Sequence, residues 1–100
     1  MAKKEIPFET KPLITNIVAC GRFSKEMDIA KIYQEVDFVD SEYNPEIYPA
    51  LLVKIIINGS KKHVTLYKNG KFIIVGATSE KEVVDIYNEI VQILKQHNYL

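Results

Sequence analysis

The sequence contains no tryptophan, a single cysteine and only four glycines in 100 residues. Because Cys20 has no second cysteine to pair with, a disulfide within this sequence is excluded, and the several ligands that a zinc site needs are missing. The glycines are scattered, so there is no glycine-rich loop of the kind that binds phosphate groups. These absences favour a reducing, cytoplasmic setting and predict no metal and no cofactor.

Long apolar runs are also absent. The longest candidate, residues 55–57 with their neighbours, is interrupted by Lys54 and falls far short of the roughly 18 residues that a membrane-spanning helix needs. Residues 1–5 are charged and lack an apolar segment, so we expect no secretory signal. With 47% hydrophobic and 26% charged residues, the composition is typical of one folded globular domain.

The net charge is zero, with 13 basic and 13 acidic residues. Taken as a sum, this balance argues against a nucleic-acid-binding domain, which is usually basic. The distribution of the charges is uneven, however. Residues 47–79 contain no Asp or Glu, and one block of the chain is therefore positive. Its lysines are Lys54, Lys61, Lys62, Lys68 and Lys71.

The first part of the chain predicts an arm, a strand and a helix. Residues 1–12 are polar and carry two prolines. Residues 13–19 are rich in β-branched side chains and predict a strand that ends at Gly21. The helix that follows is capped by Asp28, or by Ser24 a turn earlier. Its apolar side chains recur at helical spacing: Ile29, Ile32, Tyr33 and Val36.

The remainder predicts four strands and a second helix. The strands cover residues 38–43, 48–57, 63–67 and 71–75, separated by Asn44-Pro45, Asn58-Gly59 and Asn69-Gly70. Ser79 and Glu82 match a capping box at the start of a helix that runs to about Gln96. Its apolar face consists of Val83, Ile86, Tyr87, Ile90, Val91 and Leu94. We therefore expect one α+β domain over residues 13–96, in the order β-α-β-β-β-β-α, and a C-terminal tail over residues 97–100.

The hairpin at Asn69-Gly70 allows two registers. A two-residue loop pairs Tyr67 with Phe72, whereas a three-residue loop with a bulge at Gly70 pairs Leu66 with Phe72. We favour the second register. It places one apolar set on each face of the sheet: Val64, Leu66, Phe72 and Ile74 on one, and Tyr67, Lys71, Ile73 and Val75 on the other.

Both faces of the predicted antiparallel sheet are apolar. Two helices can cover only one face, and the other face of such a sheet is normally polar. We expect the uncovered face to carry an apolar patch of Val18, Tyr48, Leu52, Tyr67, Ile73 and Val75, edged by Lys54 and Lys71. An exposed patch of this kind usually meets a partner, which can be nucleic acid, another protein, a second copy or the arm of the same chain.

Several segments resemble one repeat of the TATA-box-binding protein family. They are Thr15-Asn16-Ile17-Val18, Asp28-Ile29-Ala30-Lys31-Ile32, Glu42-Tyr43-Asn44-Pro45, Asn69-Gly70-Lys71 and residues 75–80, Val-Gly-Ala-Thr-Ser-Glu. The resemblance extends in order from residue 12 to about residue 95. It implies a curved five-stranded antiparallel sheet with two helices on one face. Family members carry two such repeats, which form a saddle that grips the minor groove of DNA and kinks it with apolar wedges.

The resemblance also implies roles for individual residues. Asn16 matches an asparagine that hydrogen-bonds base edges, and Val18, Ile73 and Val75 match positions that line the groove. Tyr48 and Tyr67 occupy the positions of two intercalating phenylalanines. Lys54 and Lys71 match phosphate contacts.

The sequence departs from the family pattern at several of these places. Tyrosines stand where the family has phenylalanine wedges, and Val75 replaces a threonine. Glu46, Ile47 and Thr78 stand where basic residues are expected, so phosphate contacts are lost. A single repeat is half a saddle, and we expect a homodimer through residues 13–19 to rebuild it.

Two functions follow. The first is a nucleic-acid-binding protein that contacts duplex DNA through its minor groove, acting in transcription, with a transcription-factor protein as a further candidate partner. The alternative is a protein–protein interaction module that uses the same face without DNA. An enzyme is not expected, because Asp37, Asp40 and Glu42 lack both the spacing of a metal-binding loop and a histidine partner, and Cys20 has no histidine nearby in the sequence.

Overall fold

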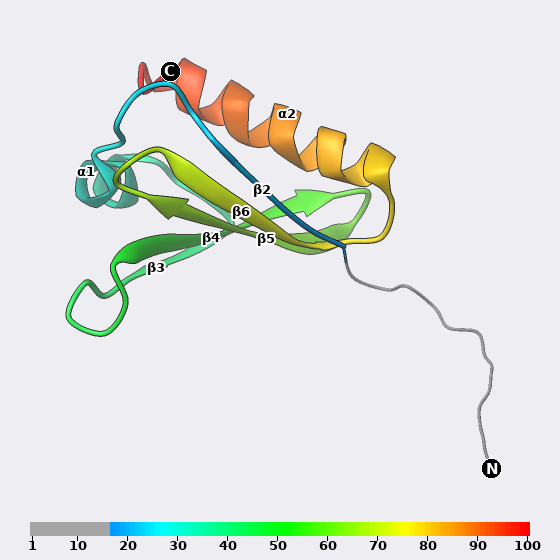
Figure 1. The fold of residues 1–100 in the computed structure, drawn as a ribbon, viewed down its shortest axis with the longest axis horizontal. Helices are drawn as coiled ribbons and strands as arrows, with labels where there is room; N and C mark the ends of the chain where they lie inside the picture. Colours follow the sequence, from blue (N-terminus) through cyan, green and yellow to red (C-terminus); the bar gives the residue numbers. More distant parts are fainter. Residues whose placement is uncertain (1–16) are drawn as a thin grey trace, which may run out of the picture.

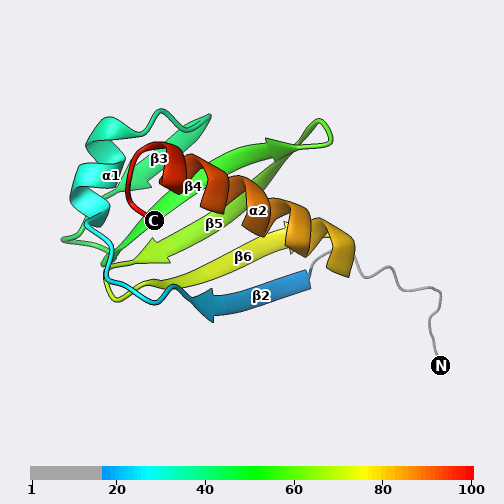
Figure 2. The same ribbon diagram turned by 90° about the horizontal axis from the view of Figure 1, so that it is seen from above.

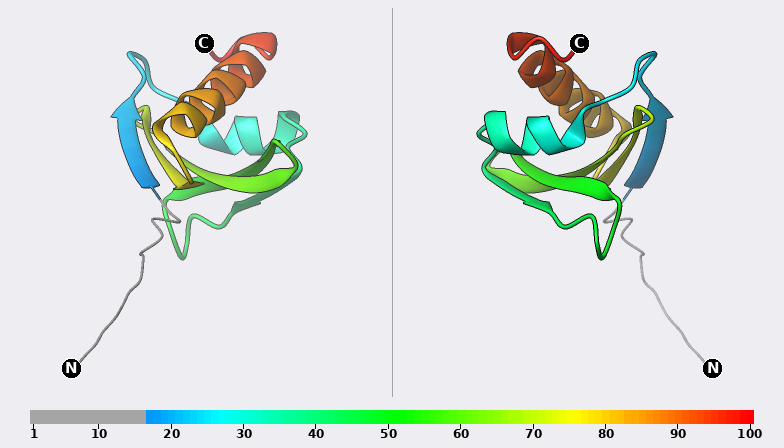
Figure 3. Two further views of the ribbon diagram at one scale, coloured as in Figure 1. Left: turned by 90° about the vertical axis from the view of Figure 1, so that its right-hand side faces the viewer. Right: turned by 90° about the vertical axis from the view of Figure 1, so that its left-hand side faces the viewer.

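The computed structural model describes residues 17–100 and shows one antiparallel sheet with two helices on one side (Figures 1 and 3). The strand order is β2-β6-β5-β4-β3, which is easiest to follow in Figure 2. The α+β class and the five-stranded sheet are therefore confirmed. The elements are β2 (Ile17–Arg22), α1 (Ile29–Glu35), β3 (Asp40–Tyr43), β4 (Ala50–Ile57), β5 (Ser60–Tyr67), β6 (Lys71–Ala77) and α2 (Glu80–Gln96).

Gly21 does not end its strand, and that prediction is wrong. Strand β2 continues to Arg22, with Gly21 opposite Phe72 of β6. A Cβ atom on Gly21 would lie 2.7 Å from the ring of Phe72. The glycine therefore leaves room for the close approach of an aromatic ring from a distant segment, which no local pattern indicates.

The start of α1 is fixed by Asp28 rather than Ser24. The Asp28 side chain accepts a hydrogen bond from the Lys31 backbone N–H at 3.2 Å, as an N-cap does. Ile29 and Ile32 face the core, whereas Tyr33 is 40% exposed and packs against Tyr43 of β3. The helical spacing thus predicted the buried face of α1, with Tyr33 at its rim.

The hairpin between β5 and β6 has the register that we favoured. Leu66 pairs with Phe72, and Gly70 has a φ of +91°, as a glycine bulge requires. The Gly70 carbonyl accepts a hydrogen bond from the Phe23 backbone N–H at 2.9 Å. A side chain on Gly70 would collide with the carbonyl oxygens of Phe23 and Lys25, so this turn is held against the segment that precedes α1.

The core lies between the helices and the inner face of the sheet. The largest fully buried side chains are Met27, Ile32, Leu51, Leu66, Ile74, Ile86, Ile90, Leu94, Val53 and Val64. Val83 and Val91 are partly buried against them, and Tyr87 is 39% exposed at the edge of α2. Within residues 17–100, neither helix is long and apolar enough to cross a membrane.

The end of the chain packs against the domain. His97 caps α2, and Asn98 takes a φ of 65°, so the chain turns back as a helix C-terminus often does. The Tyr99 backbone N–H then donates to the Leu94 carbonyl at 2.8 Å, and its hydroxyl donates to Glu35 of α1. Desolvation, followed by this hydrogen bond to Glu35, raises the pKa of Tyr99 to about 12. Residues 97–100, expected as a tail, thus connect the ends of the two helices.

The N-terminus of α2 contains a nearly buried ion pair. The Ser79 hydroxyl accepts from the Glu82 backbone N–H at 3.1 Å, which is half of the expected capping box. The Glu82 carboxylate does not return to Ser79. It accepts from the Thr78 backbone N–H at 2.8 Å and lies 2.9 Å from Lys62 Nζ. The Lys62 side chain is 8% exposed, and its Nζ also donates to the Gly76 carbonyl at 3.1 Å. This lysine is therefore paired inside the domain and does not add to a positive surface.

We expect Glu82→Gln to destabilise the protein in a pH-dependent way. Hydrogen bonding from Lys62, followed by that from Thr78, lowers the pKa of Glu82 below 4.5. The stabilisation is therefore present above about pH 4.5 and is lost as the pH falls through the lower folded-state pKa. Urea unfolding followed by circular dichroism should show wild type as the more stable protein at pH 7, with the difference shrinking below pH 4.

The control is Asp85→Asn, which breaks an exposed pair with Lys81 and should change the unfolding free energy by less than about 1 kcal/mol. A Glu82→Gln effect that does not vary with pH would contradict the role given to the Lys62–Glu82 pair.

Candidate nucleic-acid interface

The face of the sheet opposite the helices presents a continuous row of side chains across all five strands. In the strand register, Cys20 lies beside Ile73, Ile73 beside Thr65, Thr65 beside Leu52, and Leu52 beside Glu42. Directly opposite residues in a sheet point to the same side. Figure 3 shows both helices on the other side, so we call this surface the uncovered face.

The apolar patch expected on this face is confirmed. Val18 is 64% exposed, Tyr48 44% and Val75 36%, while Leu52, Tyr67 and Ile73 are half-buried among their strand neighbours. Asn16, to which the resemblance gives a base contact, lies outside the described residues. The structure thus brings together the remaining groove-lining candidates, and their contact with DNA stays a prediction.

Tyr48 and Tyr67 form a pair at one end of the uncovered face. Their hydroxyls are hydrogen-bonded to each other, and their rings meet edge to face, with centroids 6.2 Å apart and an interplanar angle of 68°. Lys71 Nζ lies 5.7 Å from the centroid of the Tyr67 ring, within the range of a cation–π contact. The hydrogen bond between the two hydroxyls is the main cause that raises the pKa of Tyr67.

Basic side chains gather near this tyrosine end. Arg22 of β2 lies directly opposite Lys71 of β6, and both are exposed. We did not predict Arg22 as part of the site, although its alternation with Val18 and Cys20 along β2 places it on the uncovered face. Two neighbouring cations are suited to phosphate oxygens.

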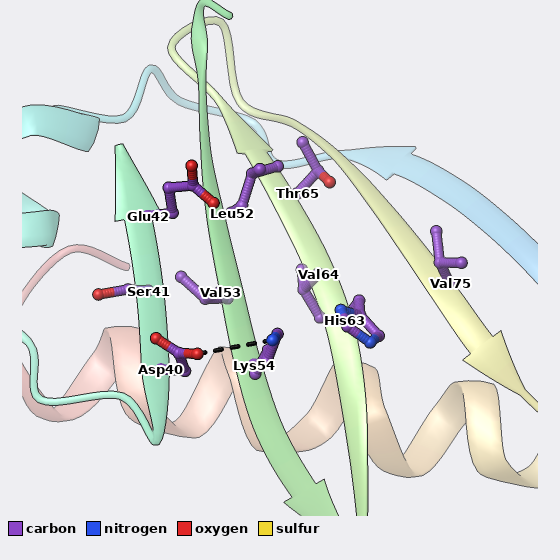
Figure 4. Close-up of a pocket in the computed structure, with 10 residues that line it drawn as sticks. All are labelled: Asp40, Ser41, Glu42, Leu52, Val53, Lys54, His63, Val64, Thr65 and Val75. Carbon is purple, nitrogen blue, oxygen red and sulfur yellow. Dashed lines mark ion pairs between the residues drawn. The ribbon is translucent and has the colours of Figure 1, made fainter. Parts of the chain in front are cut away.

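The second expected phosphate contact, Lys54, has an internal partner. Lys54 of β4 lies opposite Asp40 of β3, with 3.5 Å between Lys54 Nζ and Asp40 Oδ2. The two side chains are 38% and 56% exposed, so solvent screens the pair. Figure 4 shows this ion pair across the two strands. A phosphate that approaches Lys54 must compete with the Asp40 carboxylate.

The middle of the uncovered face is hollowed between β3 and β6. The hollow has a volume of about 490 Å³, and its side chains are shown in Figure 4. His63 lies between Lys54 and Val75 in the register, and Thr65, two residues further along β5, lies on the same face. Both were identifiable from their alternation with Tyr67, but sequence reasoning assigned neither of them a role.

Three further positions, at which the resemblance implies basic residues, hold Glu46, Ile47 and Thr78. Glu46 and Ile47 lie in the β3–β4 loop, where Ile47 is 80% exposed. Thr78 donates from both its backbone N–H and its hydroxyl to Glu82. The uncovered face therefore has two neighbouring cations at the Arg22–Lys71 end, Lys54 and Lys61 elsewhere on the sheet, and exposed carboxylates, Asp40 and Glu42, along the β3 edge.

Comparisons with known proteins identify relatives of this chain. The family model described as "Transcription factor TFIID (or TATA-binding protein, TBP)" matches residues 11–97. A TATA-box-binding protein of Pyrodictium occultum is 33% identical over 91 residues, which cover 89% of this chain and 44% of that protein. TATA-box-binding protein C of Halobacterium salinarum is 32% identical over 81 residues, which cover 81% of this chain and 44% of that protein.

A solved structure, that of the Methanococcus jannaschii TBP, superposes with a TM-score of 0.70 at 27% identity. The match covers 82% of this chain and 45% of that one, so the chain spans slightly less than half the length of the relatives that it matches. Since the family model covers most of the sequence and the fold agrees, the chain belongs to the TATA-binding protein family and contains a single repeat of its fold.

Proposed function

We propose that this protein binds duplex DNA through the minor groove, using the uncovered face of the sheet, and acts in transcription. The supporting observation is the exposed row of apolar side chains with Arg22 and Lys71 at its end. Apolar contact suits the floor and walls of a minor groove, whereas cations at the rim hold the phosphates. Family membership supports the same use of the face.

A homodimer completes the proposed gripping surface. The chain spans less than half the length of the two-repeat relatives, so two copies supply the same number of repeats. Among residues 17–100, β2 is an edge strand of the sheet, and pairing it with the β2 of a second copy would create an isologous contact and cover that edge. Of the expected interface at residues 13–19, the described part consists of Ile17, Val18 and Ala19.

A protein-interaction module remains a second candidate, with the same face holding another protein. The charge pattern favours it, because Asp40 and Glu42 lie on that face and Asp40 already pairs with Lys54. DNA binding and protein binding differ in their dependence on the lysines. Phosphate contacts are lost with the cation, whereas apolar contacts hardly depend on it.

We expect Lys71→Gln to weaken DNA binding more than Lys54→Gln does. Each lost phosphate contact should reduce affinity roughly fivefold to tenfold near 0.1 M salt and lower the salt slope by about one. Because Lys54 is already paired with Asp40, Lys54→Gln should reduce the affinity for DNA by less than Lys71→Gln does. Fluorescence anisotropy with AT-rich and mixed duplexes at several salt concentrations measures both effects.

The matched control is Lys81→Gln, which removes the same charge from α2 on the other side of the sheet. Wild-type protein that binds no duplex at low salt, or that binds with no salt dependence, would rule out DNA binding by this face. Unchanged affinity in both lysine variants would favour the protein-interaction module.

Asp40→Asn is expected to have the opposite effect. Removing the carboxylate frees Lys54 for a phosphate, so affinity should rise by about twofold to fivefold and the salt slope should steepen by up to about one. Asp85→Asn on α2 provides the same change in net charge away from the face. Equal gains in the two variants would mean that net charge alone, rather than competition for Lys54, controls affinity.

We expect the protein to be a dimer in solution. Light scattering at micromolar concentration should give about twice the 11.5 kDa of one chain. A dimer through β2 leaves the uncovered face of each copy open, so it should still bind DNA. A monomer would contradict the dimer, and a dimer that cannot bind duplex would indicate that the face itself is the interface between copies.

A further inference from the structure

We propose that Tyr48 and Tyr67 form a hydrogen-bonded latch that holds their rings together and limits their insertion between base pairs. This inference rests on the proposed function and specifies how one end of the face meets DNA. The protein would then contact the groove at this end with the rims of two linked rings, and it would kink the duplex less than two phenylalanines at the same positions.

The two tyrosines are held by their backbones as well as by their hydroxyls. Tyr67 is the last residue of β5 and lies opposite Ala50. The Tyr48 backbone N–H donates to the Asn44 carbonyl at 2.9 Å, and its carbonyl accepts from the Ala50 N–H at 2.9 Å. Because both backbones are fixed, the rings can separate only by rotation of the side chains, which breaks the bond between the hydroxyls.

The surroundings of Tyr67 also oppose insertion. A ring that stacks between two base pairs must offer both of its faces. The Tyr67 ring instead has Lys71 Nζ 5.7 Å from its centroid and meets Tyr48 edge to face. Insertion of the Tyr67 ring would break its contact with the Lys71 ammonium and its edge-to-face contact with the Tyr48 ring. Two contacts would thus be lost in addition to the hydrogen bond.

Desolvation of the hydroxyls adds to this cost. In the latch, each hydroxyl has a partner and remains at the surface. Between stacked bases, a hydroxyl would enter an apolar space without a guaranteed partner, which is unfavourable. A phenylalanine in the same position carries no such group. The latch thus predicts that removing both hydroxyls favours insertion.

The test compares wild type with Tyr48→Phe/Tyr67→Phe on one AT-rich duplex labelled with a donor and an acceptor dye at its ends. We expect the double variant to bind about tenfold more tightly and to shorten the end-to-end distance, seen as higher energy transfer. Tyr87→Phe, which removes a hydroxyl on the helix side, is the matched control and should change neither quantity. A double variant with wild-type affinity and wild-type energy transfer would overturn the latch while leaving the proposed function intact.

A second measurement needs no DNA. In protein with ¹³C-labelled tyrosine, the Tyr67 resonance, assigned with Tyr67→Phe, should titrate at a lower pH in Tyr48→Phe than in wild type, because the hydrogen bond between the two hydroxyls raises the pKa of Tyr67. An unchanged titration would show that the hydroxyls are not paired and would overturn the latch alone. If neither wild type nor the double variant binds duplex at low salt, the proposed function and the latch both fall.

Discussion

The arrangement of the protein depends on the burial of apolar surface from a sheet that is apolar on both sides. Leu51, Val53 and Ile55 lie against the helices, and their neighbours along β4 point the other way. Two helices are enough to cover one side only, as Figure 3 shows. The folded domain therefore has a surface on which Val18, Ile73 and Val75 are in contact with solvent.

The charges on the exposed surface determine which partners it can bind. The strand register determines which charged side chains lie on that surface. The positive block of the sequence does not form one positive surface. Lys62 points inward to Glu82, Lys54 is held by Asp40, and Lys71 remains beside Arg22. A block that is uniform along the chain is thus divided among the core, an ion pair and the surface. The result is a face with a basic end and an acidic edge.

Local patterns predicted the parts of the fold that depend on neighbouring residues. The Asp28 cap, the Leu66–Phe72 register and the buried side of α2 follow from capping chemistry, a glycine turn and helical spacing. Sequence reasoning missed three features that join distant segments. Phe72 fills the space above Gly21, and Asp40 meets Lys54 only once β3 and β4 are in register. The two tyrosine hydroxyls come from the loop before β4 and from the end of β5. Such pairings are set by tertiary packing, which no short window contains.

The presence of one repeat has a consequence for what two copies of the chain can recognise. Relatives with two covalently joined repeats are free to differ between their halves. Two identical chains related by a twofold axis present the same side chains to both halves of a binding site. The homodimer proposed above would match a palindromic sequence best and bind it equally well in either direction, so any information about the direction of reading along the duplex would have to come from another molecule.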